Sequence, residues 1–88
     1  MKIEKERLRR TLARRLGVEP TELANENVTL KEILEISPTA INSIDIMEAF
    51  IGSLVDLGAQ TDLELPAVTL DDKLDNTLDT IVSAVATT

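Results

Sequence analysis

A serine followed by spaced acidic residues marks the segment AINSIDIMEAF (residues 40–50), where the chain has its best candidates for chemistry. Ser43 stands at the start of an apolar, helix-like run, and Asp45 and Glu48 follow it. One use for Ser43 is capping, because Ser and Asn are favoured N-cap residues and either Asn42 or Ser43 fits. The other is to carry a phosphate-linked group, which the free amides and dipole of a helix N-terminus favour.

The composition excludes most catalytic chemistry. The 88 residues contain no cysteine and no histidine, so the chain lacks a thiol nucleophile and the commonest general base and zinc ligand. A serine–histidine–aspartate nucleophile at Ser43 is therefore excluded. The one aromatic residue, Phe50, gives no platform for stacking bases. We predict a chain that is not an enzyme and holds no metal.

Charge is divided unevenly along the sequence. Residues 1–15 hold seven basic and two acidic residues, whereas the rest of the chain holds two basic and fourteen acidic ones. The net charge of −7 would repel nucleic acid from most of the surface, and the acidic part favours a basic partner protein. The arginines of the first segment are interpreted as a solvated helix face.

The chain has the length of one small domain, residues 1–88. Its charged start lacks the apolar core of a signal peptide, and no apolar run approaches the ~20 residues that span a bilayer. We therefore expect a cytoplasmic monomer that does not insert into a membrane.

Hydrophobic periodicity predicts an all-α fold, a small antiparallel bundle of three main helices plus one short helix. The main helices are expected at 2–16, 43–57 and 77–85, and the short one at 67–74. The long connection from 18 to 42 contains two possible helical turns, one of them opened by Thr29 with Glu32 in a capping box. The predicted core includes Leu8, Leu12, Leu16, Ile33, Met47, Ile51, Leu54, Leu78, Ile81 and Val82.

The sequence resembles the acyl carrier protein family over most of its length. LARRLGVEPTELANENVTLKEI is similar to the family's first helix and opening loop, and NSIDIMEAF is similar to its attachment motif. LELP and TLDTIVSAV are similar to the run after the second helix and to the last helix. The motif's placement among three flanking matches makes the resemblance more specific than the motif alone. Asn42 stands where the family usually has aspartate, and the loop before it is longer than usual.

The resemblance implies that Ser43 carries 4′-phosphopantetheine, moved from coenzyme A by a phosphopantetheinyl transferase with magnesium. The thiol of that arm would hold an acyl group as a thioester for enzymes of fatty-acid, lipid or polyketide-type synthesis. Basic patches on those enzymes would meet Asp45 and Glu48, with Asp56 a weaker candidate for the same contact. Ile46, which stands apart from the main apolar cluster of its helix, is assigned to the same partner surface.

Two alternatives remain open from the sequence. The same arm could carry an aminoacyl or peptidyl group. Alternatively, the chain could be an unmodified helical interaction domain. In that case Ser43 only caps a helix, and the acidic stripe formed by Asp45, Glu48 and Asp56 docks a partner.

Overall fold

The computed structural model describes residues 3–25, 27–58 and 69–86, and these ranges contain four α-helices, one 3₁₀ turn and no strand. Their bounds are α1 Lys5–Leu16, η1 Pro20–Glu22, α2 Leu30–Ile36, α3 Ser43–Asp56 and α4 Leu74–Ala86. The predicted all-α class is confirmed. None of the helices in the described ranges is long and apolar enough to cross a membrane.

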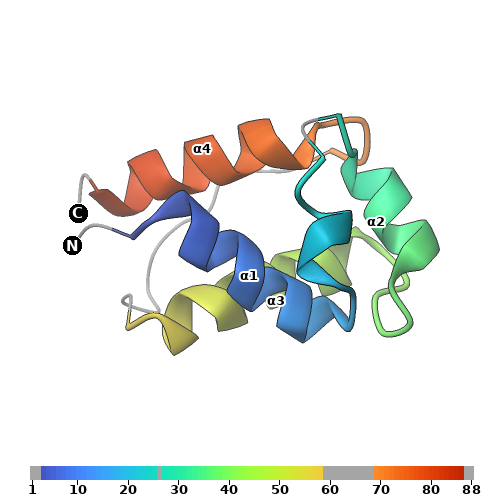
Figure 1. The fold of residues 1–88 in the computed structure, drawn as a ribbon, viewed down its shortest axis with the longest axis horizontal. Coiled ribbons are helices and arrows are strands. Elements are labelled where there is room, and N and C mark those ends of the chain that lie inside the picture. The colour runs from blue at the N-terminus through green and yellow to red at the C-terminus, as the bar shows by residue number, and fades with distance from the viewer. Residues whose placement is uncertain (1–2, 26, 59–68, 87–88) are drawn as a thin grey trace.

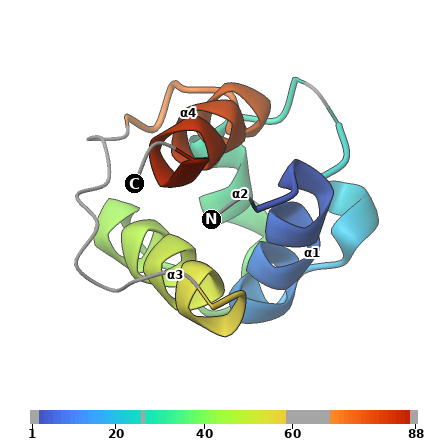
Figure 2. The same cartoon turned by 90° about the vertical axis from the view of Figure 1, so that its left-hand side faces the viewer.

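The three long helices enclose one core. In Figure 1, α1 runs from left to right, whereas α3 and α4 run from right to left. Figure 2 looks along the bundle and shows α1, α3 and α4 around the centre, with α2 across the far end. Helix α1 packs against both α3 and α4, so it holds the two other long helices together.

Helix α1 follows the leucine spacing of the sequence. Leu8, Leu12 and Leu16 are at most 1% exposed and face α3 and α4. The helix ends at Gly17, whose φ of 71° is the left-handed conformation that glycine adopts readily at a helix C-terminus. A leucine at each turn and a terminating glycine thus account for the length of α1.

The short helix lies earlier in the chain than predicted. It is α2, which is closed at its start by a capping box between Thr29 and Glu32. The prediction of a helix at 67–74 was wrong over 69–73, which contain a turn and an isolated β-bridge from Lys73 to Thr29. Residues 67 and 68 lie outside the described ranges. The backbone of 70–74 instead bonds to that of 28–31: Leu30 N–H donates to Asp72 C=O and Leu74 N–H donates to Val28 C=O. Helix α4 begins directly afterwards.

The buried face of α3 is rotated from the predicted one. Phe50 and Leu54 are buried as part of the core, but Ile51 is 44% exposed and Met47 only half-buried, so their core assignment was wrong. Apolar residues cover more than half of the circumference of α3, so its sequence fits several orientations. The close approach of α1 selects the face with the small residues Ala49 and Ser53, both of which are buried.

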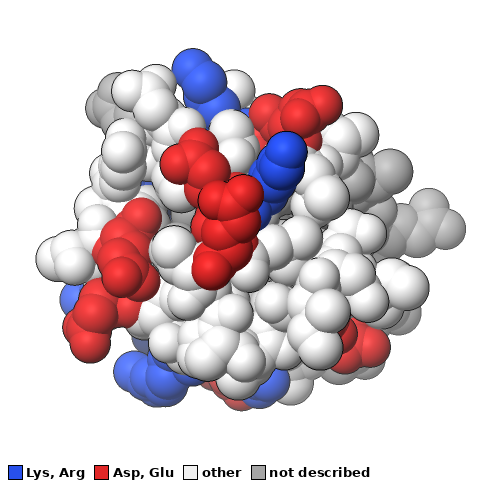
Figure 3. Space-filling view, turned by 90° about the vertical axis from the view of Figure 1, so that its right-hand side faces the viewer, with Lys and Arg blue, Asp and Glu red and all other residues white. Residues whose placement is uncertain are grey.

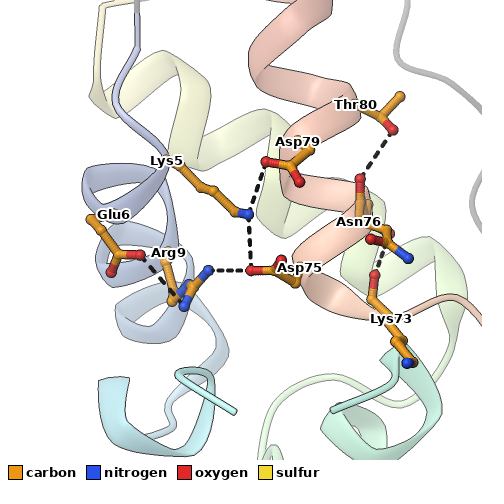
Figure 4. A network of polar contacts seen from close by, with 9 residues as sticks. Lys5, Glu6, Arg9, Lys73, Asp75, Asn76, Asp79 and Thr80 are labelled. Carbon is orange, nitrogen blue, oxygen red and sulfur yellow. Dashed lines mark hydrogen bonds and ion pairs between the residues drawn. The ribbon is translucent and has the colours of Figure 1, made fainter. Parts of the chain in front are cut away.

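An ion-pair network joins α1 to the start of α4 (Figure 4). Lys5 Nζ lies 2.9 Å from Asp75 Oδ1 and 2.8 Å from Asp79 Oδ1. Arg9, which is only 8% exposed, places Nη2 2.7 Å from the same Asp75 oxygen. The hydrogen bond from Lys5, followed by the charges of Lys5 and Arg9, holds the pKa of Asp75 below its usual value. Basic residues of α1 are thus used to fix α4.

Lys5→Gln should therefore raise the pKa of Asp75 toward its ordinary value of 3.8. Because the folded pKa is depressed, the pair stabilises the fold above that value and its contribution is lost as the pH falls through the folded pKa. The carboxyl resonance of Asp75 in an NMR pH titration measures the shift. Arg7→Gln removes the same charge from an exposed position of α1 that makes no ion pair with any residue the structure describes. An equal shift in both variants would contradict the role of Lys5.

Candidate functional site

Ser43 is the first residue of α3, and it is not the residue that caps this helix. Asn42 has an extended backbone, and its Oδ1 accepts a hydrogen bond of 3.1 Å from the N–H of Asp45. The Ser43 side chain is half-buried, and its hydroxyl has no hydrogen-bond partner in the described part of the chain. Of the two possible caps in the sequence, the structure selects Asn42, so the Ser43 hydroxyl has no structural role of that kind.

Asp45 holds the turn that leads into Ser43. Its Oδ2 accepts a hydrogen bond of 2.8 Å from the N–H of Ile41, while its own N–H bonds to Asn42. These two hydrogen bonds tie Ile41 and Asn42, which precede Ser43, to Asp45, which follows it. Asp45 is therefore half-buried and engaged, rather than a freely projecting acid.

The longer connection before Ser43 is anchored to the end of α1. Ser37 Oγ donates a 2.6 Å hydrogen bond to the carbonyl of Leu16 and accepts one of 3.1 Å from the N–H of Ala40. Pro38 covers Gly17, where an added Cβ would lie 3.1 Å from the proline Cγ. One end of this connection is fixed to α1 by Ser37, and the other is fixed to α3 by Asp45. These contacts therefore hold Ser43 in place relative to α1.

The acidic stripe on α3 contains one unpaired carboxylate. Glu48 is exposed and makes no hydrogen bond or ion pair within the described ranges. Asp56 is held by Arg15 of α1, whose Nε and Nη2 each lie 2.9 Å from one of its carboxylate oxygens. The hydrogen bond from Arg15 is the main reason that the pKa of Asp56 is lowered. Asp56 is thus partly neutralised within the chain.

Arg15 reaches Asp56 by crossing Gly52. A Cβ built on Gly52 would lie 2.5 Å from Cζ of Arg15, so any larger residue would displace the guanidinium group. The sequence analysis did not identify this contact, because the partners lie 41 residues apart. The signal in the sequence is the set of small residues on this side of α3, which allows a close neighbour, and that neighbour is α1.

Exposed apolar side chains extend from the connection before Ser43 along α3. Ile41 is 84% exposed and Ile44 66% exposed, and Ile51 and Val55 continue the row at 44% and 43%. Figure 3 shows the end of the molecule that carries α2 and the segment leading into α3, where acidic groups border a broad uncharged area. The sequence analysis did not assign Ile41 or Ile44 to a surface.

A shallow hollow of about 210 Å³ lies between α1, the connection and α3. Arg15 and Leu16 line one side and Thr39 and Ala40 another, while α3 contributes Asp45, Glu48 and Ala49. The hollow therefore carries the one unpaired acid of the stripe, Glu48, at its edge.

Ile46 does not belong to this surface. It is 1% exposed and lies in the core, which corrects its assignment to partner binding. Since a helix turns by about 100° per residue, Ile46 shares a face with the buried residues Phe50 and Ser53. Two other serines are engaged: Ser37 bonds to α1, and the buried Ser53 hydroxyl donates 2.7 Å to the carbonyl of Ala49.

Within the described ranges, no group of three or more His, Cys, Asp or Glu residues is placed to hold a metal ion. No family model matches the sequence, and neither curated proteins nor solved structures show a significant similarity to it.

Proposed function

We propose that this chain is an acyl-carrier-like protein that bears 4′-phosphopantetheine on Ser43. The observation that carries the proposal is the Ser43 hydroxyl, which stands at the first position of α3 without a hydrogen-bond partner among the described residues. The neighbouring Asn42 provides the cap, so the hydroxyl can be modified without loss of the helix start. The resemblance of the surrounding motif to the family's attachment site supports the same assignment.

The start of α3 suits the phosphodiester of such an arm. The backbone N–H groups of Ser43 and Ile44 lie in the first turn and have no partner in the described part of the chain. Unpaired amides and the helix dipole favour an anion there by ~0.3–1 kcal/mol at an exposed site. The residues present therefore fit the group.

The division of labour follows from the composition of the chain. When bound, the arm supplies the thiol that forms a thioester, which a chain without cysteine cannot supply itself. In the transfer, Ser43 Oγ forms a bond to phosphorus as the pyrophosphate bond of coenzyme A breaks, and 3′,5′-ADP leaves. The hydroxyl proton passes to a general base, and because the chain has no histidine for this role we assign that base to the transferase.

A direct test uses the chain, coenzyme A, magnesium and a broad-specificity phosphopantetheinyl transferase. The intact mass should increase by one arm. Protein isolated from its natural host should carry the same arm, and the mass of any thioester on it distinguishes an acyl from an aminoacyl cargo. A chain that no transferase accepts, and that is unmodified in its host, would instead be an interaction domain.

The partner surface in this proposal is the exposed side of α3 next to Ser43. Glu48 supplies charge to it, and Ile44 and Ile51 supply apolar area. The hollow beside Glu48 leaves space for a basic side chain from the partner. Asp45 also adds negative charge to this surface. Its main role is to position Ser43, because its carboxylate accepts a hydrogen bond from the N–H of Ile41.

Glu48→Lys should lower kcat/KM for loading by the transferase about 2- to 10-fold at low salt, because a favourable charge becomes a repulsive one. The difference should shrink as salt rises and screens the interaction. Glu35→Lys is the matched control, since Glu35 is an exposed acid of α2 with no partner in the described ranges. Equal rates for both variants at low salt would show that Glu48 is only a solvated residue.

A further inference from the structure

The basic residues of α1 form two sets with different roles. Lys5 and Arg9 pair with acids of α4, and Arg15 pairs with Asp56 of α3. Arg7, Arg10 and Arg14 are exposed and make no ion pair within the described ranges, although the charge of Arg14 helps Arg15 to lower the pKa of Asp56. These three arginines, here called the arginine surface, form none of the ion pairs that join α1 to α3 and α4 in the described ranges.

The arginine surface is a line rather than a cluster. Its members are spaced three and four residues apart, which puts them on one side of α1. At 1.5 Å of rise per residue, the line is about 10 Å long. It borders a hollow of about 450 Å³ that is closed on the other side by Asp56 and Leu57 at the end of α3. Thr11 of α1 and Glu4, the residue before α1, also line it.

Positive charge dominates this hollow. Asp56 already receives two hydrogen bonds from Arg15, and Glu4 lies at one end of the row. Guanidinium groups bind carboxylates through paired hydrogen bonds, and three in a row match carboxylates repeated along one face of a helix. One phosphate would need the three groups to converge on a point instead of following a line.

Lipid is a poor fit for this face. A helix that binds a membrane surface buries apolar side chains in it, but the leucines of α1 face the core. The exposed large apolar residues of the described ranges all lie between Ile36 and Val55. The chain has a net charge of −7. A nucleic acid in extended contact with it would therefore be repelled by the acidic residues outside α1. A short acidic helix contacts the arginine surface alone, and charges beyond about 8 Å are largely screened at physiological salt.

We propose that the arginine surface docks an acidic helical segment of a partner protein whose carboxylates recur at the i, i+3, i+7 spacing. This contact uses α1 and not the Ser43 side of α3, and it does not depend on modification of Ser43. The molecule would then present two surfaces of opposite charge to two different partners.

The test uses the unmodified chain and an alanine-based helical peptide with three glutamates at the i, i+3, i+7 spacing. NMR titration at ~0.15 M ionic strength should shift the side-chain Nε–H resonances of Arg7, Arg10 and Arg14, and should leave the backbone amide resonance of Lys31 unchanged. A peptide with the same glutamates in a scrambled order should bind more weakly. Arg7→Gln/Arg10→Gln should lose about 2- to 30-fold in affinity, from two exposed ion pairs.

Lys31→Gln/Lys73→Gln is the matched control, because it changes the net charge by the same amount at exposed residues outside α1. It should retain affinity within about twofold, as expected for screened, distant charges. Equal losses in the two double variants, or no preference for the ordered peptide, would overturn the proposal. Tighter binding to anionic phosphatidylglycerol vesicles or to duplex DNA than to the peptide would overturn it as well.

Discussion

Ser43→Ala should abolish loading of the chain with phosphopantetheine, whereas Ser83→Ala should load like the unaltered protein. Ser83 is exposed in the second half of α4, and its hydroxyl also has no partner in the described part of the chain. It lacks a helix N-terminus and the bonds that fix the turn around Ser43. Intact mass after incubation with coenzyme A, magnesium and a transferase gives the answer for both variants. We expect no loading at all in Ser43→Ala, because the Ser43 Oγ atom itself forms the bond to the phosphorus of the arm.

The stability of the same variants separates function from capping. Ser43→Ala should leave the unfolding free energy nearly unchanged, since the lost hydroxyl makes no hydrogen bond and alanine favours helix by a few tenths of a kcal/mol. Asn42→Ala should cost ~0.5–2 kcal/mol, because the N–H of Asp45 loses its acceptor. Loading that persists in Ser43→Ala would place the arm elsewhere. A large destabilisation by Ser43→Ala would instead mean that Ser43 is the cap.

Local rules accounted for the ends of several elements. The first helix was expected to end at residue 16, and Gly17 ends it there in the left-handed conformation. Thr29 and Glu32 were expected to form a capping box, and both of its hydrogen bonds are present. These features involve residues within a few positions of one another, so the sequence contains the information that they need.

Features that depend on long-range packing were not predictable in the same way. The orientation of α3 is set by contact with α1, so Ile46 is buried and Ile51 exposed although both are isoleucines of one helix. The expected helix at 67–74 competes with backbone bonds between Leu30 and Asp72, which lie far apart in the chain. Composition and periodicity carry no information about such partners.

The candidate site shows the same division. Its serine, its helix start and its acids were identified from the sequence, through helix periodicity together with the resemblance to the attachment motif. The choice between Asn42 and Ser43 as cap needed side-chain geometry, because both residue types favour that position. The pairing of Asp56 with Arg15 needed the tertiary structure. Of the predicted acids, only Glu48 is left as an exposed, unpaired charge in the described ranges, which concentrates the docking prediction on one residue.

Phe50→Ala should destabilise the fold by ~3–5 kcal/mol, because the ring is fully buried and its removal leaves a cavity in the core. Small domains have ~5–15 kcal/mol of stability in total, so this variant should unfold at much lower urea concentration. Ile51→Ala, one residue further on the same helix, is the matched control. Ile51 is 44% exposed and should lose well under half as much, since part of its area is already in water. Urea unfolding followed by circular dichroism measures both. Equal losses, or a greater loss for Ile51→Ala, would mean that α3 turns toward the core the face predicted from its sequence. Ile51 would then be buried and would not be part of the partner surface next to Ser43.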